Sequence, residues 1–130
     1  MGKTAARGIF QTSFHVPGEL SANLNIRWTA PCDMTLLHVS AVQSDADACG
    51  VTVGISTDTD GYLEVYSCGI SDTPVQKEAI TDFSGTTSLS QYPRVSDGDI
   101  LVIIVDYDYN AAAGGGAASD VTIVLTFAPG

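Results

Sequence analysis

The chain has 130 residues, enough for one domain that buries a hydrophobic core without a metal ion or a disulfide. Hydrophobic residues make up 45% of the sequence and charged residues only 15%, which excludes a disordered chain because so much apolar surface can offset the entropy lost on folding. With 15 acidic and 5 basic residues the net charge is −10, which disfavours binding to nucleic-acid phosphates.

The charge is unevenly distributed along the chain. Residues 1–18 contain two bases and no acid, and all of the acidic residues follow them. We therefore divide the chain into a basic N-terminal arm at residues 1–10 and one domain at residues 11–130. The arm is either a solvated terminus or a strap that docks on an acidic neighbouring subunit. If it docks, the expected contact residues are Lys3, Arg7, Ile9 and Phe10.

The first expected strands are marked by alternating apolar and polar residues. Phe10, Phe14 and Val16 share one face of the first strand. Residues 20–28 alternate cleanly over nine positions, which predicts a single strand with one buried face. Residues 34–42 carry apolar side chains at positions of both parities, which predicts a strand buried on both faces.

The middle of the chain gives weaker signals. Residues 51–55 alternate, and Asp60-Gly61 predicts the turn of a hairpin that leads into a strand at residues 62–68. A further weak strand is expected at residues 76–83. The uniformly apolar residues 100–105 predict a central strand.

The last strand, at residues 121–127, alternates again, and an alanine- and glycine-rich segment at residues 111–118 precedes it. Three consecutive glycines oppose a helix there. The segment is either a long hairpin loop or a place where the backbone closely approaches a partner subunit. In the second case the contact residues are Ala113, Gly114, Gly115 and Gly116.

These elements define the fold class. No segment has a sustained apolar period of 3.6 residues, and seven to eight strands separated by turns predict an all-β chain folded as an antiparallel, jelly-roll-like β-sandwich. There is no apolar stretch long enough for a membrane span and no secretory signal pattern. We therefore expect no membrane partner and synthesis in the cytoplasm of a host cell.

The three cysteines, Cys32, Cys49 and Cys68, are an odd number and contain no C-x-x-C pair. We expect buried free thiols. One disulfide that leaves one thiol unpaired is the alternative, and the spacing does not say which two would pair.

No constellation of catalytic residues is present. His15 and His38 both lie in expected strands, and the sequence contains neither a nucleophile elbow nor a P-loop. We therefore expect no enzyme activity, no cofactor and no resident metal. Asp106, Asp108 and Asp120 flank the loop at residues 111–118 and are expected to be solvated carboxylates, with a Ca²⁺ site as the alternative.

The tyrosines give the best indication of a ligand site. Tyrosine rings can stack on a sugar while neighbouring carboxylates bind its hydroxyl groups. The same rings could instead anchor a protein interface or lie half-buried at the rim of the core. The possible ligand-binding residues are Tyr62, Tyr107, Asp108 and Tyr109.

Four segments carry a resemblance to a known family. They are Trp28-Thr29-Ala30-Pro31, Met34-Thr35-Leu36-Leu37-His38-Val39-Ser40-Ala41, Val95-Ser96-Asp97-Gly98-Asp99-Ile100-Leu101-Val102 and Val121-Thr122-Ile123-Val124-Leu125-Thr126-Phe127. Over residues 20–127 this order of strand and turn residues resembles small β-sandwich virion proteins of tailed bacteriophages, which include capsid decoration (cement) proteins.

The resemblance implies a structural protein on the exterior of a bacteriophage capsid. The resemblance also implies binding to the major capsid protein, stabilisation of its lattice and, since such proteins are often trimers, a homotrimeric state. The alternative function is a glycan- or receptor-binding β-sandwich module of a phage tail or fibre. The sequence does not distinguish a capsid location from a tail location.

Overall fold

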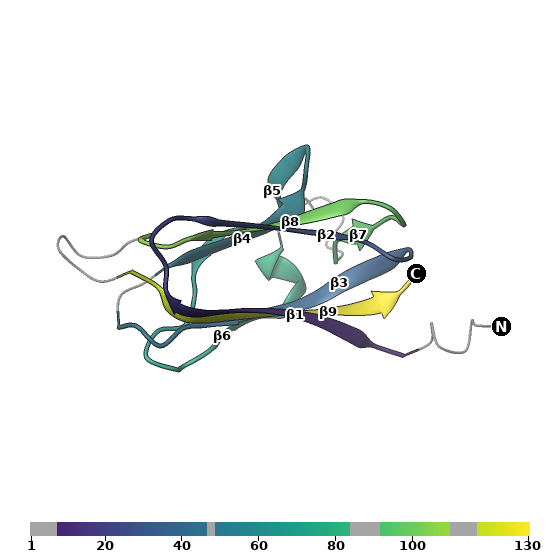
Figure 1. The fold of residues 1–130 in the computed structure, drawn as a ribbon. Helices are drawn as coiled ribbons and strands as arrows, with labels where there is room; N and C mark the ends of the chain where they lie inside the picture. Colours follow the sequence, from purple (N-terminus) through teal and green to yellow (C-terminus); the bar gives the residue numbers. More distant parts are fainter. Residues whose placement is uncertain (1–7, 47–48, 84–91, 110–116) are drawn as a thin grey trace.

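The computed structural model describes residues 8–46, 49–83, 92–109 and 117–130 (Figure 1). Within these ranges the chain forms nine β-strands and a short 3-10 helix, η2 (Ile80–Asp82). The strands are β1 (Phe10–Glu19), β2 (Leu24–Thr29), β3 (Met34–Val42), β4 (Gly50–Ile55), β5 (Asp58–Ser67), β6 (Val75–Lys77), β7 (Arg94–Val95), β8 (Ile100–Asp106) and β9 (Ser119–Pro129).

The strands form two sheets that lie one above the other (Figure 1). One sheet has the order β1-β9-β3-β6, with β7 also paired to β3, and the other has the order β2-β8-β4-β5. The pairs between named strands are antiparallel. Strands that follow one another in the chain occupy matching positions in the two sheets: β1 and β2, β9 and β8, β3 and β4, and β6 and β5. This is the winding of a jelly roll. The predicted antiparallel, jelly-roll-like sandwich is therefore confirmed, with a two-residue strand, β7, beyond the expected seven to eight.

The hydrophobic core lies between the two sheets. Its largest members, among them Phe127, Met34, Leu36, Leu101 and Ile103, are fully buried. Alternation explains this arrangement, because β9 places Val121, Ile123, Leu125 and Phe127 inward and its intervening residues outward. In the part of the chain that the structure describes, no helix is long and apolar enough to cross a membrane.

Residues 20–28 do not form the single strand that their alternation predicts. Strand β1 of the first sheet ends at Glu19, and β2 of the other sheet begins only at Leu24. Between them Leu20 is buried, and its N–H donates to the carbonyl of Ala118 at 2.8 Å. Both sheets direct apolar side chains into the same core between them. The alternation therefore continues through the crossover, and the sequence pattern does not reveal where the chain passes from one sheet to the other.

The apolar residues at both parities of β3 have a different cause from the one predicted. Leu36 pairs with Phe127 but His38 pairs with Thr126, so Leu37 is an extra residue that forms a β-bulge. The bulge shifts the inward positions by one residue. The buried side chains are therefore Met34 and Leu36 before it and Val39 and Ala41 after it.

The hairpin between β4 and β5 turns earlier than predicted. The turn is at Ser56-Thr57, and Asp60-Gly61 lies within β5. Strand β5 folds back over β4 so closely that a side chain at Gly54 would collide with the backbone of Asp58 and Thr59. The weak strand expected at residues 76–83 is also shorter, because β6 ends at Lys77 and η2 follows.

The cysteines form one disulfide, between Cys49 and Cys68, and Cys32 remains free. The expectation of three free thiols was wrong and the alternative holds. The β4–β5 ladder places Gly50 opposite Ser67, so the cysteines that flank these two residues also face each other. Their Cα atoms are 5.6 Å apart, within the range that a disulfide spans.

Candidate functional site

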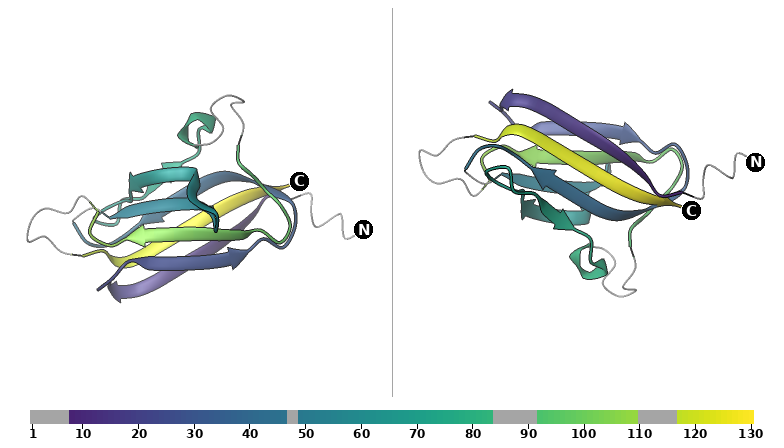
Figure 2. Two further views of the ribbon diagram at one scale, coloured as in Figure 1. Left: turned by 90° about the horizontal axis from the view of Figure 1, so that it is seen from above. Right: turned by 90° about the horizontal axis from the view of Figure 1, so that it is seen from below.

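Two surfaces of the sandwich have features of a binding site, and the first is one of its open edges. Strands β1 and β2 lie at the same edge of the two sheets (Figures 1 and 2). Among the described residues, β1 pairs only with β9 and β2 only with β8. Their inward-facing side chains pack against the core but remain partly exposed. We call this row the open edge: Phe10, Phe14 and Val16 of β1 and Leu24, Ile26 and Trp28 of β2.

The open edge is almost free of charge. Residues 8–29 contain one acid, Glu19, and one base, Arg27, although the whole chain carries 15 acids. The centres of protein interfaces are depleted in charged residues and enriched in aromatic ones. The unpaired backbone groups of an edge strand also offer hydrogen bonds to a partner. The open edge therefore combines the composition and the bonding capacity of an interface.

The residues predicted for the N-terminal arm fall partly at this edge. Ile9 is 67% exposed and directly precedes β1. Phe10, expected in the arm, is the first residue of β1, and its ring stacks on that of Phe127 with centroids 5.6 Å apart. The remaining predicted contact residues, Lys3, Arg7, Ala113, Gly114, Gly115 and Gly116, lie outside the described residues.

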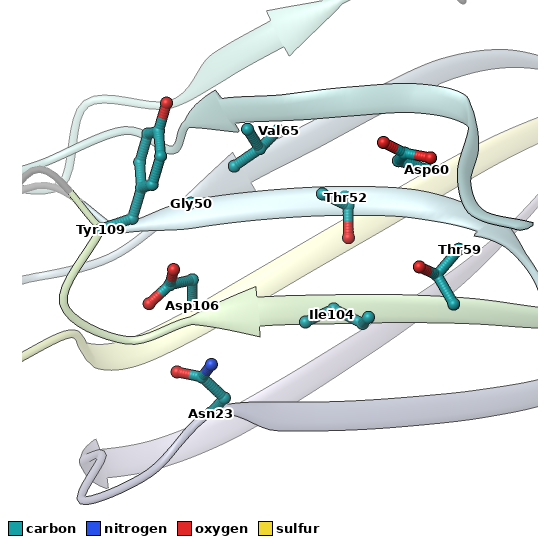
Figure 3. Close-up of a pocket in the computed structure, with 9 residues that line it drawn as sticks. All are labelled: Asn23, Gly50, Thr52, Thr59, Asp60, Val65, Ile104, Asp106 and Tyr109. Carbon is teal, nitrogen blue, oxygen red and sulfur yellow. The ribbon is translucent and has the colours of Figure 1, made fainter.

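The second surface is a groove of about 340 Å³ on the outer face of the sheet β2-β8-β4-β5 (Figure 3). Tyr109, Asp106 and Asn23 lie at one end of the groove. Thr59 and Asp60 of the folded-back β5 lie at the other end. The groove is thus lined by residues of three strands, β4, β5 and β8, together with the residue that precedes β2 and one that follows β8.

The middle of the groove is lined by Thr52 of β4, Ile104 of β8 and Val65 of β5 (Figure 3). Inward-facing neighbours fix this orientation, because Val51 and Val53 belong to the core and Thr52 lies between them. The groove surface is therefore apolar in part, with hydroxyl and carboxyl groups at defined positions.

Two pairs of acids affect the charge of the groove. Burial raises the pKa of Asp106 above its ordinary value, and a hydrogen bond shared with the carboxyl of Asp108 raises it further. At the other end, a hydrogen bond between the carboxyls of Asp58 and Asp60 raises the pKa of Asp58. Both shifts favour the protonated form of one carboxyl in each pair, in which it donates a hydrogen bond to the other.

Of the four residues predicted to bind a ligand, Tyr109 lines the groove. Tyr62 is half-buried against the core, and its hydroxyl donates to the carbonyl of Arg94 at 3.1 Å. Tyr107 also packs partly against the core, and Asp108 is exposed beside the groove, where it bonds Asp106. The sequence therefore indicated one end of the groove and missed the residues from β4 and β5.

The two histidines lie on the outer face of the other sheet. His15 Nδ1 is 2.7 Å from Thr122 Oγ1, and His38 Nε2 is 2.8 Å from Gln76 Oε1. Each contact joins neighbouring strands. The histidines therefore act as cross-strand partners in a polar sheet surface.

The three acids considered for Ca²⁺ do not converge on one point. Asp120 Oδ1 accepts from the N–H of Gly18 at 2.8 Å, and Asp120 Oδ2 accepts from the hydroxyl of Ser44 at 2.9 Å. Asp106 instead bonds Asp108. Within the described ranges, no group of three or more His, Cys, Asp or Glu side chains is placed to hold a metal ion.

Comparison with known proteins gives structural matches without sequence matches. No protein-family model and no curated protein matches the chain. It is similar to a chain of the cyanophage Pam1 capsid asymmetric unit, with a TM-score of 0.51 and 16% identity over 95% of this chain and 84% of that one. More distant neighbours are a CBM4 structure (TM-score 0.36, 17% identity, 88% and 77% covered) and Desmodium yellow mottle tymovirus (TM-score 0.36, 11% identity, 92% and 85% covered). The first likeness shows a shared fold.

Proposed function

We propose that this chain is a structural virion protein, a capsid decoration (cement) subunit that binds a major capsid protein lattice and stabilises it. The observation that carries the proposal is the open edge. Six large apolar side chains remain partly exposed there, in a region that holds only two of the chain's twenty charged residues. A row of exposed apolar side chains of this kind is typical of a surface that another protein covers.

The likeness to a cyanophage capsid chain supports the proposal, because it extends over nearly the whole of both chains. The resemblance of residues 20–127 to small virion proteins of tailed phages points the same way. Both support a virion protein as the proposed identity, and the proposed decoration role adds an exterior location and a homotrimeric state.

The proposed mechanism is passive and involves no catalysis. Binding to an assembled lattice buries the open edge. The bound protein then stabilises the lattice by an amount that grows with the logarithm of the ratio of its concentration to its dissociation constant. A stable contact of this kind buries roughly 1,200–2,000 Å² in total. One edge of a small sandwich supplies part of that area, and the N-terminal arm is proposed to supply more.

The test is co-sedimentation with capsids that lack the protein. Thr12 lies in the inward row of β1 between Phe10 and Phe14 and is partly exposed, so Thr12→Lys places a charge in the open edge. Ser13→Lys places the same charge on the opposite, exposed face of the same strand and is the matched control. We expect Thr12→Lys to weaken capsid binding about tenfold or more, as loss of a central interface contact does, and Ser13→Lys to leave it unchanged.

A deletion of residues 1–9 tests the arm separately, since it leaves β1 intact. It should weaken binding without lowering the melting temperature. If the unaltered protein does not sediment with capsids, or if Thr12→Lys and Ser13→Lys bind alike, the proposal is wrong.

A further inference from the structure

The groove on the sheet β2-β8-β4-β5 is independent of the open edge and is formed by a specific local arrangement. A side-chain carbon at Gly50 would come within 2.7 Å of Tyr109 Cγ and 2.8 Å of Val65 Cγ2. Real carbon atoms do not approach so closely, so only glycine lets the Tyr109 ring lie across β4. The absence of a side chain at position 50 therefore positions the aromatic wall of the groove (Figure 3).

The groove also contains a polar group that the protein leaves unpaired. Thr52 lines the floor of the groove, and its hydroxyl oxygen is buried just beneath that floor, without a hydrogen-bond partner among the described residues. A buried polar group without a partner is unfavourable, and most such groups in proteins are satisfied. Rotation of the Thr52 side chain about χ1 would bring the hydroxyl to the groove surface, where a ligand could give it its missing partner.

The surrounding groups define the kind of ligand. Asp106 and Asp60 provide carboxyl oxygens, and Tyr109 provides a ring face. Asn23 provides amide N–H donors, since its Oδ1 already accepts from the N–H of Tyr107 at 3.1 Å. No lysine or arginine is among the described residues that line the groove, and the chain carries a net charge of −10. An anionic ligand would be repelled, whereas a neutral ligand with many hydroxyl groups and an apolar ring face would match.

We propose that this groove binds a neutral saccharide. Its volume of about 340 Å³ is at the lower end of the range for small-molecule sites, roughly 300–1,000 Å³, and suits a short saccharide. The sugar ring lies against Tyr109, and its hydroxyl groups bond Asp106, Asn23 and Thr52. Such a site adds to a virion protein a means of binding surface glycans.

The test uses a glycan array that carries neutral oligosaccharides beside sialylated and sulfated ones, followed by calorimetric titration with the strongest neutral glycan. Two variants alter the groove without a large change in the core. Tyr109→Ala removes the ring wall, and Thr52→Val replaces the unpaired hydroxyl by a methyl group of similar size. Thr122→Val is the matched control, because it removes a threonine hydroxyl from the outer face of the other sheet.

We expect binding to neutral glycans, about tenfold weaker in Thr52→Val and in Tyr109→Ala and unchanged in Thr122→Val. Thr12→Lys at the open edge should also bind the glycan normally. The saccharide proposal can therefore be wrong while the capsid proposal holds, and the capsid proposal can be wrong while the saccharide proposal holds. The proposal is overturned if no neutral glycan is bound, if acidic glycans bind more tightly, or if both groove variants bind as well as the unaltered protein.

Discussion

The indole ring of Trp28 stacks on the ring of Phe127 with centroids 5.5 Å apart, and this contact joins β2 of one sheet to β9 of the other. Phe10 stacks on the same phenylalanine at 5.6 Å. Three aromatic rings therefore hold the two sheets together at the open edge. The middle ring is fully buried and the outer two are partly exposed.

This stack predicts unequal costs for two similar substitutions. Phe127→Ala leaves a cavity in the core and should lower the free energy of unfolding by about 3–5 kcal/mol. Phe10→Ala removes a ring that is only partly buried and should cost about 1–2 kcal/mol. Urea denaturation of both variants measures the difference. Equal losses would mean that the stack is not what joins the sheets.

The disulfide between Cys49 and Cys68 closes a loop with a sequence separation of 19 residues. In the chain-entropy model, closing a loop of this length stabilises the folded state by about 3 kcal/mol. Reduction, or the Cys49→Ser/Cys68→Ser double variant, should lower the free energy of unfolding by that order. Cys32→Ser should lower it much less, because Cys32 is unpaired. A reduced protein as stable as the oxidised one would contradict the pairing.

Two tyrosines of β5 differ in whether their hydroxyl groups are paired. The Tyr66 hydroxyl is buried and lacks a hydrogen-bond partner among the described residues, whereas the Tyr62 hydroxyl donates to the carbonyl of Arg94. Tyr66→Phe should therefore leave the free energy of unfolding unchanged or raise it by about 1 kcal/mol, and Tyr62→Phe should lower it by about 1 kcal/mol. Thermal and urea unfolding of the two variants provide the comparison, and a loss in Tyr66→Phe would show that its hydroxyl has a partner.

The Asp120 carboxylate predicts part of the acid sensitivity of the fold. Hydrogen bonds from the Gly18 N–H and the Ser44 hydroxyl hold the pKa of Asp120 below its ordinary value of 3.8. The folded state favours the ionised form, so the stabilisation is present above the unfolded pKa and is lost as the pH falls through the lower folded pKa.

Asp120→Asn keeps a residue that tolerates the positive φ of 53° at this position but removes the charge. The variant should be less stable than the unaltered protein at neutral pH, and the gap should close as the pH falls below the ordinary pKa. Unfolding curves across this pH range test the prediction. A gap that is constant with pH would mean that the Asp120 charge is not involved.

The strands that alternate cleanly were the most predictable part of the fold. β9 follows its pattern throughout, because every second residue enters the same core. The errors arose where three-dimensional pairing overrides local pattern. A crossover between sheets divides residues 20–28, a bulge at Leu37 changes the parity of β3, and a two-residue turn at Ser56-Thr57 takes the place expected for Asp60-Gly61.

The candidate sites were less predictable than the fold, for a physical reason. The groove depends on Gly50, Thr52 and Asp106 meeting across neighbouring strands, and no sequence spacing encodes that neighbourhood. The disulfide likewise depends on the β4–β5 register. The open edge was partly visible, because the residues of β1 and β2 carry so few charges, but only the strand order identifies both strands as sheet edges.

We propose that this sandwich binds a capsid lattice through the edge formed by β1 and β2. Electron cryomicroscopy of capsids incubated with the protein tests it most directly. We predict ordered density for the sandwich on the capsid exterior, with Phe14 and Trp28 covered by a neighbouring subunit. A map in which the sandwich is bound but these two side chains face solvent, or in which no sandwich is present, would contradict the claim.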